Sequence, residues 1–313
     1  MGASRELAWV KVADTCAWTP RDSCGEVVYK GRMWLMGGWP GSVLDVWSSA
    51  NGTAWTRATP KAAWLHCDLP TSLVFRDRMW MIAGWQGGRK PTASASNQAW
   101  WSTDGAEWHQ ATAKAPWCPR LGAAGVVFKD RMWILGGVER YHQGDNTLLN
   151  DVWSSADGVH WEQATAHAAW APRSCHAAVV FDGKIWVYGG GNYRPTYTGY
   201  NDVWNSADGV HWTRVTAHAA WSHRIWFSGV VYRGRMWVLG GWSDRPSTNW
   251  NDVWHSADGM TWTELKAGNI WSKRHEHSAY VFDDKIWVMA GNPWPVVNDV
   301  WSLHIPEGWL DGR

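Results

Sequence analysis

The sequence predicts an all-β fold, a six-bladed β-propeller whose blades are four-stranded antiparallel sheets. Three observations lead to this prediction. A unit of about 50 residues recurs along the chain, which is typical of radial or linear repeat folds. Each copy holds two pairs of short apolar runs separated by turn residues, which indicates two hairpins. The last copy is incomplete, and its missing part is found at the N-terminus.

Tryptophan marks the repeat, because 24 of the 32 Trp residues fall into four series with one member in each copy. The first series, the leading tryptophans, comprises Trp18, Trp64, Trp117, Trp170, Trp221 and Trp271. The second comprises Trp34, Trp80, Trp133, Trp186, Trp237 and Trp287, and the third Trp47, Trp100, Trp153, Trp204, Trp254 and Trp301. The fourth comprises Trp55, Trp108, Trp161, Trp212 and Trp262, with Trp9 in the vacant sixth place. Large rings at fixed positions in every copy predict packing between blades.

Each copy contains two predicted hairpins. Apolar runs such as AAVVF and KIWVYGG flank a turn dipeptide, and NDVWNS and VHWTRV flank Ala-Asp-Gly. The Asn-Gly and Asp-Gly dipeptides favour the positive φ angles of a two-residue type I′ turn. We expect one domain over residues 1–313, with blades at about 18–55, 64–108, 117–161, 170–212, 221–262 and 271–301 plus 7–13. The N-terminal segment would be the outermost strand of the last blade and close the ring.

Composition excludes several classes of partner. The 29 Lys and Arg residues nearly balance 28 Asp and Glu residues, which argues against a cationic face for nucleic acid or anionic lipid. No apolar run approaches the roughly 18 residues of a membrane span, and residues 1–12 lack the apolar stretch of a secretion signal. We therefore expect a cytoplasmic monomer without nucleic acid or membrane partners.

The five cysteines suggest neither a disulfide framework nor a metal site. They are odd in number, lack a C-x-x-C pair and occupy different positions of the repeat. Ligands of one metal ion must converge on a single point. With His275, Glu276 and His277 nearby, a metal site is the alternative, but small buried side chains explain the cysteines at least as well, and the sequence predicts no metal and no cofactor.

The repeat resembles the kelch repeat, whose superfamily includes a sialic acid mutarotase and the central domain of galactose oxidase. The resemblance rests on a Gly-Gly pair followed by N-D-V-W and a later Trp, and it covers about residues 7–302. The pairs are Gly37-Gly38, Gly136-Gly137, Gly189-Gly190 and Gly240-Gly241, with Ala83-Gly84 and Ala290-Gly291 as departures. It implies a propeller, but kelch propellers range from peptide-capturing adaptors to enzymes. The copper constellation of galactose oxidase and the iron motif of the plant specifier proteins have no counterpart here.

Strand direction predicts which face carries the function. The segment that leads into each inner strand and the loop after each Gly-Gly pair should lie on the same face. Three positions after the leading Trp, five copies have arginine and the second copy has Cys67. Converging guanidinium groups would form an anion-binding funnel, while the alternative is pairing with carboxylates or carbonyls of a neighbouring blade. The arginines are Arg21, Arg120, Arg173, Arg224 and Arg274.

Tryptophans outside the four series are further candidates, since the scaffold does not require them. Trp39, Trp85 and Trp242 follow Gly-Gly or Ala-Gly pairs, and Trp226 lies in a leading segment. We expect these four to wall a pocket on the same face. The alternative is that the loops pack on their own indoles.

Two glutamates and two histidines are candidates for acid–base chemistry. Glu26 stands where other copies have Gly, Ala or Ser, and Glu276 lies beside His275. A carboxyl among small residues near a shaft should have a raised pKa, as a general acid requires. His66 also departs from the repeat. The alternative for the glutamates is a hydrogen bond to shaft water or pairing with an arginine.

Together these features predict that the chain binds a small anionic or polar metabolite or sugar at the mouth of the shaft. Conversion of that ligand would be non-redox proton transfer of the isomerase or lyase kind, using Glu276, Glu26, His275 and His66. The alternative is a protein-interaction module that captures an acidic peptide on the same face.

Overall fold

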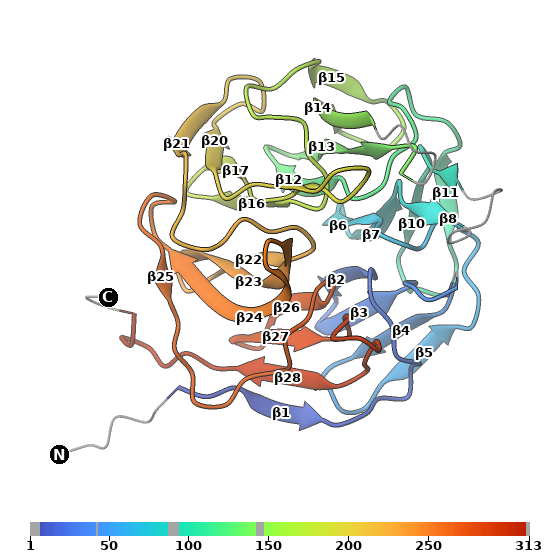
Figure 1. The fold of residues 1–313 in the computed structure, drawn as a ribbon. Coiled ribbons are helices and arrows are strands. Elements are labelled where there is room, and N and C mark those ends of the chain that lie inside the picture. The colour runs from blue at the N-terminus through green and yellow to red at the C-terminus, as the bar shows by residue number, and fades with distance from the viewer. Residues whose placement is uncertain (1–6, 42, 87–93, 142–146, 311–313) are drawn as a thin grey trace.

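Six four-stranded antiparallel sheets surround a central shaft in the computed structural model of the protein (Figure 1), which describes residues 7–41, 43–86, 94–141 and 147–310. The predicted six-bladed propeller is therefore confirmed. None of the described residues forms a helix that is long and apolar enough to cross a bilayer.

In blades one to five, the four strands follow one another in chain order from the shaft outwards. Blade one holds β2 (Gly25–Tyr29), β3 (Arg32–Met36), β4 (Val46–Ser49) and β5 (Thr56–Thr59). Blade two holds β6 (Thr71–Phe75), β7 (Arg78–Ile82), β10 (Ala99–Ser102) and β11 (His109–Thr112). Blade three holds β12 (Ala124–Phe128), β13 (Arg131–Glu139), β14 (Thr147–Ser155) and β15 (Glu162–Thr165). Blade four holds β16 (Ala177–Phe181), β17 (Lys184–Tyr188), β20 (Val203–Ser206) and β21 (Thr213–Thr216). Blade five holds β22 (Ser228–Tyr232), β23 (Arg235–Asp244), β24 (Ser247–Ser256) and β25 (Thr263–Glu264).

The two ends of the chain share blade six, as predicted. Its inner strands are β26 (Ser278–Phe282), β27 (Lys285–Met289) and β28 (Val300–Leu303), and its outermost strand is β1 (Val10–Ala13). Val10 pairs with Ser302 and Ala13 with Val300 in antiparallel register. The N-terminal strand therefore covers an edge that would otherwise be open.

Indole pairs pack inside every blade. Each leading Trp is at most 1% exposed and meets the fourth Trp of its own copy edge to face, with ring centroids 5.6–6.1 Å apart. In blade six this partner is Trp9, which meets Trp271 at 6.1 Å and 88°. Such contacts add to the burial energy of the rings themselves.

The second Trp of a copy packs against the next blade. A Cβ added at Gly105 of blade two would lie 2.2 Å from the Trp34 ring of blade one, and Gly158, Gly209 and Gly259 repeat this contact around the ring. Only a glycine fits there. The outer Asp-Gly turns are thus blade-to-blade contacts.

The predicted type I′ turn geometry holds in the inner hairpins and fails in the outer ones. Both central residues have positive φ in the inner hairpins, for example Lys30 (47°) and Gly31 (68°), which is the type I′ pattern. In the outer hairpins the Asn51-Gly52 turn has positive φ only at Gly52, and the Ser49 hydroxyl accepts a hydrogen bond from the Gly52 N–H. A longer loop that side chains stabilise replaces the predicted two-residue turn.

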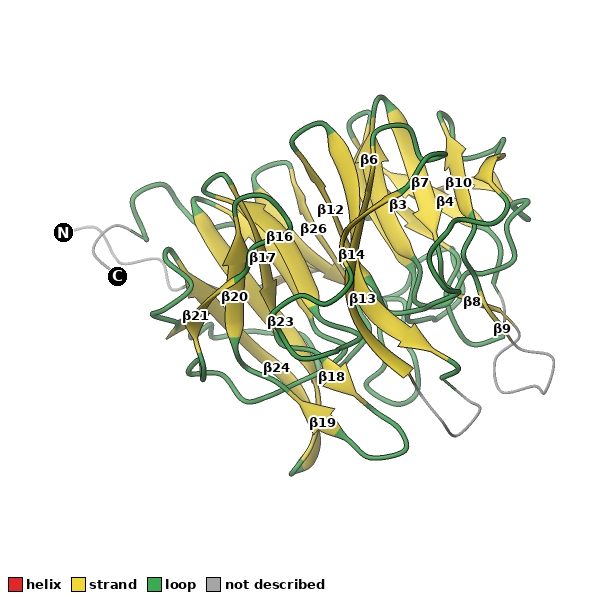
Figure 2. Cartoon of the chain, turned by 90° about the horizontal axis from the view of Figure 1, so that it is seen from above, coloured by secondary structure: helices red, strands yellow, loops and turns green. Residues whose placement is uncertain are grey.

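The loops after the second strands project from one side of the disc (Figure 2). They include two small hairpins, β8 (Trp85–Gln86) with β9 (Ser94–Ala95) and β18 (Gly191–Asn192) with β19 (Thr198–Gly199). Isolated bridges tie each leading segment to the loop after its Gly-Gly or Ala-Gly pair, as between Asp22 and Trp39. The two kinds of segment that we expected on one face therefore lie together.

Candidate functional site

The five repeat arginines are fully buried and lie inside the blades. Arg224 donates from its two terminal nitrogens to the carboxylate oxygens of Asp252 at 2.6 and 2.8 Å, and to the Gly240 carbonyl at 2.8 Å. The same bidentate pairing joins Arg21 to Asp45, Arg120 to Asp151, Arg173 to Asp202 and Arg274 to Asp299. Each aspartate belongs to the same blade as its arginine and also accepts a hydrogen bond from a Trp of the third series.

Blade two shows that this pair is a unit. It has Cys67 where the other copies have arginine, and Gln98 where they have the aspartate. Trp100 still donates its indole N–H to the Gln98 side-chain oxygen at 3.0 Å. Blade two therefore lacks both the arginine and its aspartate. This is expected, because either residue alone would leave a buried charge without a partner.

The predicted arginine funnel is therefore wrong. These guanidinium groups have no exposed surface, and each donates to both oxygens of its aspartate and to two backbone carbonyls, as Arg224 does to Asp252, Ser222 and Gly240, so they are not available to a ligand. They fasten the leading segment of a blade to its third strand. The alternative of ion pairing was correct in kind, although the partner comes from the same blade.

A closed ring of main-chain hydrogen bonds surrounds the shaft where the leading segments end. One residue per blade, five positions after the leading Trp, donates its N–H to the carbonyl of its counterpart in the preceding blade, at 2.8–3.3 Å. All six have φ between 48° and 61°. The ring residues are Ser23, Leu69, Gly122, Cys175, Trp226 and Glu276. Their backbones are fixed alike, while their side chains differ completely.

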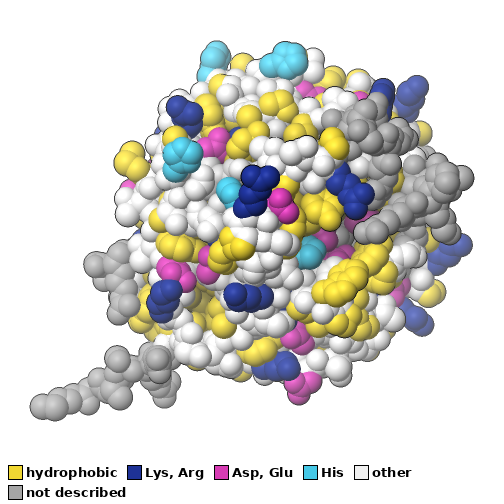
Figure 3. Space-filling model, in the orientation of Figure 1, with side chains coloured by type: hydrophobic (Ala, Val, Ile, Leu, Met, Phe, Trp, Pro, Cys, Tyr) yellow, Lys and Arg dark blue, Asp and Glu magenta, His cyan; other side chains and the backbone are white. Residues whose placement is uncertain are grey.

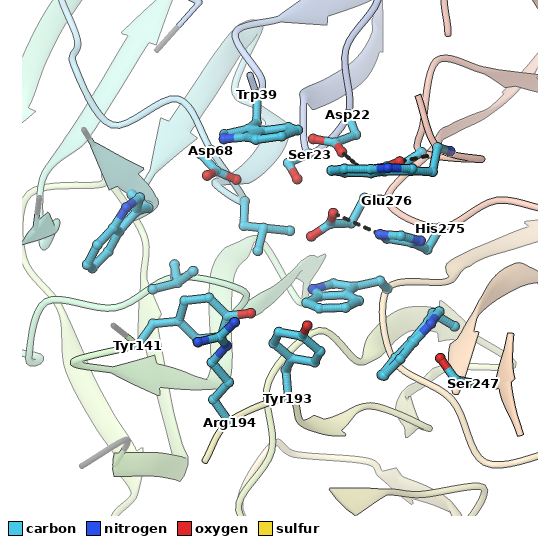
Figure 4. A pocket seen from close by; sticks show the side chains of 17 residues that line it. Asp22, Ser23, Trp39, Asp68, Tyr141, Tyr193, Arg194, Ser247, His275 and Glu276 are labelled. Atoms are coloured by element: carbon cyan, nitrogen blue, oxygen red, sulfur yellow. Dashed lines mark hydrogen bonds and ion pairs between the residues drawn. The ribbon is translucent and has the colours of Figure 1, made fainter. Parts of the chain in front are cut away.

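The mouth pocket is a cavity of about 420 Å³ that opens above this ring. On one side it is lined by Asp22, Asp68 and Glu276, which come from blades one, two and six and lie around the Ser23 hydroxyl (Figure 4). Asn292 donates to Asp22 Oδ2 at 2.9 Å, and the buried Asp22 Oδ1 has no hydrogen-bond partner among the described residues. The wall on this side is therefore acidic.

Burial raises the pKa of all three carboxyl groups. Desolvation raises the pKa of Asp68 to about 7, against a partial lowering by the Ser23 hydroxyl. For Asp22 and Glu276, burial is again the main cause, and the charges of neighbouring carboxylates raise each pKa further. Like charges this close oppose joint ionisation. The pocket therefore holds exchangeable protons near neutral pH.

Aromatic rings line much of the remaining wall. Trp39, Trp85, Trp226 and Trp242 all border the cavity, together with Trp294 at the rim, whose side chain is 74% exposed. Apolar side chains gather beside the centre of this face (Figure 3). Some of these rings also pack on one another: Trp226 stacks on His275 with centroids 5.2 Å apart and touches Tyr193 at 4.8 Å. The loops thus pack on their own indoles and still leave a cavity.

The structure separates the four predicted acid–base residues. Glu276 and His275 both line the mouth pocket, with Oε2 and Nε2 3.6 Å apart. His275 Nδ1 donates a hydrogen bond to Asn249 Oδ1 at 2.6 Å, and burial lowers the pKa of His275 to about 4. His66 borders none of the described cavities, and burial lowers its pKa to about 4.

Glu26 lies below the ring, in a shaft chamber of about 210 Å³. Burial raises its pKa to about 7, while Ser278 and the Ala279 N–H lower it in part. Ser23, Leu69, Trp226 and Glu276 border both the chamber and the mouth pocket. Glu26 thus faces the underside of the ring rather than a ligand in the mouth.

Sequence reasoning missed Asp22, Asp68, Ser23 and Asn292. The first two occupy the position four residues after the leading Trp, where other copies have Leu121, Ser174, Ile225 and His275. Comparing that position between copies would have shown two carboxylates in adjacent blades. Glu26 became a candidate because it departs from the residues of the other copies. Asp22 and Asp68 depart from their repeat position in the same way.

The fold and the pocket define a propeller of the binding-module class. The chain belongs to the kelch-repeat family, since the family described as the KLHDC2/KLHL20/DRC7 Kelch-repeats domain matches residues 70–291. It is 33% identical over 139 residues to the dynein alpha chain of the flagellar outer arm of Chlamydomonas reinhardtii. That match covers 42% of this chain and 3% of the dynein chain.

One further curated protein and one solved structure are similar to this chain. The leucine-zipper-like transcriptional regulator 1 homolog of Drosophila melanogaster is 36% identical over 106 residues, which are 31% of this chain and 10% of that protein. The chain thus matches only a small part of these curated relatives. The solved structure of YjhT superposes with a TM-score of 0.77 at 12% identity and covers 95% of this chain and 98% of its own, which shows a shared fold.

Proposed function

We propose that the chain binds a small polar organic ligand, such as a sugar or another polar metabolite, in the mouth pocket. The observation that carries this proposal is one cavity of about 420 Å³ in which three carboxyl groups face a wall of indoles. The volume lies within the range of small-molecule sites. Carboxyl oxygens would fix polar groups of the ligand, and indole faces would cover its apolar surface.

The charge of the pocket changes the expected ligand. Buried Asp22, Asp68 and Glu276 disfavour the anionic metabolite and the acidic peptide that the arginine pattern suggested. A neutral or cationic polar ligand fits the wall better. A cytoplasmic location remains part of the proposal, because all five cysteines are unpaired thiols.

Proton transfer to the ligand is a second candidate function, favoured by one observation. A carboxyl group with a raised pKa, Glu276, lies beside His275, whose lowered pKa keeps it neutral. A proton donor and a proton acceptor at neutral pH therefore meet in one pocket, as non-redox isomerases and lyases require.

Calorimetry with a panel of neutral sugars, acidic sugars and organic amines tests binding. We expect at least one neutral or cationic ligand to bind, and Trp226→Ala to weaken it about tenfold or more. The matched control is Trp101→Ala, because Trp101 lies on the outer part of blade two between Arg78 and His109. Equal weakening by both variants, or binding of acidic sugars alone, would contradict the proposal.

A further inference from the structure

Among the described residues, the acidic wall of the mouth pocket has fewer cations and hydrogen-bond donors than its three carboxyl groups can accept from. In the part of the chain that the structure describes, the ion pair found at Asp22, Asp68 or Glu276 is that of Glu276 with His275 at 3.6 Å. Ser23 lies beside all three carboxyls. Its hydroxyl has a single hydrogen to donate and can serve one of them at a time. Acceptors therefore outnumber donors on this wall.

Asp22 shows the deficit most clearly. Its side chain is 1% exposed and borders the cavity, yet Oδ1 has no hydrogen-bond partner among the described residues. Buried carboxylate oxygens normally have such partners. An oxygen left without one beside an open cavity is a place for a donor supplied by a ligand.

The opposite walls suit a positive charge as well. Trp39, Trp85, Trp226 and Trp242 border the same cavity, and the face of an indole ring attracts cations more strongly than any other aromatic side chain does. An ammonium group has donors and no acceptor, so it complements carboxylates that have acceptors and no donor. Both walls therefore favour the same chemistry.

We propose that the ligand of the mouth pocket carries a cationic nitrogen, an amine or ammonium group, held by Asp22, Asp68 and Glu276 and covered by the indoles. This inference rests on the proposed function and names the ligand class of the same site. Protons that the carboxyls share in the empty pocket leave when the cation enters. Binding is thus an exchange of protons for an organic cation.

The groups around the site decide how binding depends on pH. The ionisable residues Asp22, Asp68, Glu276, His275, Tyr141, Tyr193 and Arg194 border the cavity, and Glu26, Cys24, Cys175, His176 and His277 border the chamber below. Burial raises the pKa of both cysteines and of Tyr141, and it lowers the pKa of His275 to about 4 and those of His176 and His277 to about 3. Asp22 and Asp68, each with a pKa raised to about 7, are therefore the groups of the mouth pocket that titrate between pH 6 and 8. A cation that favours their ionised form should bind about tenfold more tightly per pH unit for each proton released.

Ethanolamine, as its primary ammonium ion, and its uncharged carbon isostere, 1-propanol, test the inference by calorimetry. The ammonium group of ethanolamine stays protonated between pH 6 and 8, so any proton released comes from the protein. We expect ethanolamine to bind about tenfold more tightly at pH 7 than at pH 6, with a binding heat that depends on the ionisation enthalpy of the buffer. We expect the isostere to bind at least about tenfold more weakly.

Two variants and two controls assign the protons. Asp68→Asn should weaken ethanolamine binding about tenfold and reduce the slope of affinity against pH, and Glu276→Gln should do the same. Glu26→Gln should keep the slope, because Glu26 lies below the ring. Asp130→Asn, an exposed aspartate paired with Arg76, should change nothing.

The outcomes separate this inference from the proposed function. Ethanolamine binding that does not depend on pH, equal binding of the isostere, or no ethanolamine binding up to about 10 mM would overturn the cationic nitrogen. Binding of glucose or another neutral ligand that Trp226→Ala weakens would then still support the proposed function. Failure of the whole panel would overturn both.

Discussion

Breaking one buried Arg–Asp pair should destabilise the propeller and leave its ligand affinity unchanged. Arg224 has no exposed surface and is bound by both oxygens of Asp252 and by the Gly240 carbonyl. Removing one partner of a buried ion pair costs about 3–5 kcal/mol, because the other charge stays buried without compensation. We therefore expect Arg224→Cys to lower the melting temperature by about 10 °C.

Blade two supplies the design of the second variant. It folds with Cys67 and Gln98 in place of the pair, and Gln98 keeps the hydrogen bond to Trp100. Asp252→Gln alone should therefore be about as harmful as Arg224→Cys, since it leaves the guanidinium unpaired. The double variant should cost at least about 2 kcal/mol less than the sum of the single costs.

Urea and thermal unfolding of the wild type, both single variants and the double variant give the coupling energy of the pair. Calorimetry with the mouth-pocket ligand on the same four proteins gives the affinities. Additive single costs below about 1 kcal/mol, together with a loss of ligand affinity in Arg224→Cys, would refute a structural role and restore an anion-binding one.

Three further predictions concern packing, pH and closure. Gly105→Ala should lower the free energy of unfolding in urea by more than about 2 kcal/mol, because the new Cβ would lie 2.2 Å from Trp34. The control Gly31→Ala, whose Cβ meets nothing within 4 Å, should lower it by about 1 kcal/mol through its positive φ alone. Equal losses of stability would argue against the packing role of Gly105. Glu26→Gln should raise the melting temperature at pH 8 more than at pH 5. The pKa of Glu26 is raised from 4.5 to about 7 in the folded protein, so the wild type loses up to about 3 kcal/mol of folding stability as the pH rises towards 7. A gain in melting temperature that does not depend on pH would contradict this. Trp9→Ala should cost about 3–5 kcal/mol, and a melting temperature equal to that of the wild type would rule out closure by the N-terminal strand.

The fold could be predicted because its signal is periodic. Four Trp series in step fix the number of copies, and the vacant place in the fourth series points to Trp9, which the structure pairs with Trp271. Each copy must bury the same side chains, so the burial pattern recurs in the sequence with the period of the repeat. The geometry of the outer turns was harder to predict from the sequence, because the conformation of Asn51-Gly52 depends on the Ser49 hydroxyl as well as on the dipeptide.

The site was only partly predictable, for a different reason. A sequence position tells which face a residue reaches, but not whether its side chain points to the cavity or back into the blade. The arginines turn back because an aspartate two residues before the third-series Trp receives them, as Asp252 receives Arg224. Blade two lacks both the arginine and the aspartate, and this joint absence already indicated in the sequence that the two residues pair. Two carboxylates of the acidic wall, Asp22 and Asp68, share one position of the repeat, but Glu276 lies at the next position, so no single repeat position displays the whole wall.

The ring of six main-chain hydrogen bonds explains how one scaffold permits an asymmetric pocket. The bonds use only backbone groups, so a ring side chain has no part in closing the shaft and is free to vary. Its acidic half nevertheless depends on closure of the propeller. Glu276 is the last ring residue in the chain, and its carbonyl accepts from the Ser23 N–H at 3.0 Å, while Asn292 reaches Asp22 at 2.9 Å across 270 residues of sequence. These contacts cross the junction between the last and first blades, which β1 stabilises by completing blade six. An opened junction would separate Glu276 from Asp22 and Asp68, so the strand that closes the fold also assembles the carboxyl cluster.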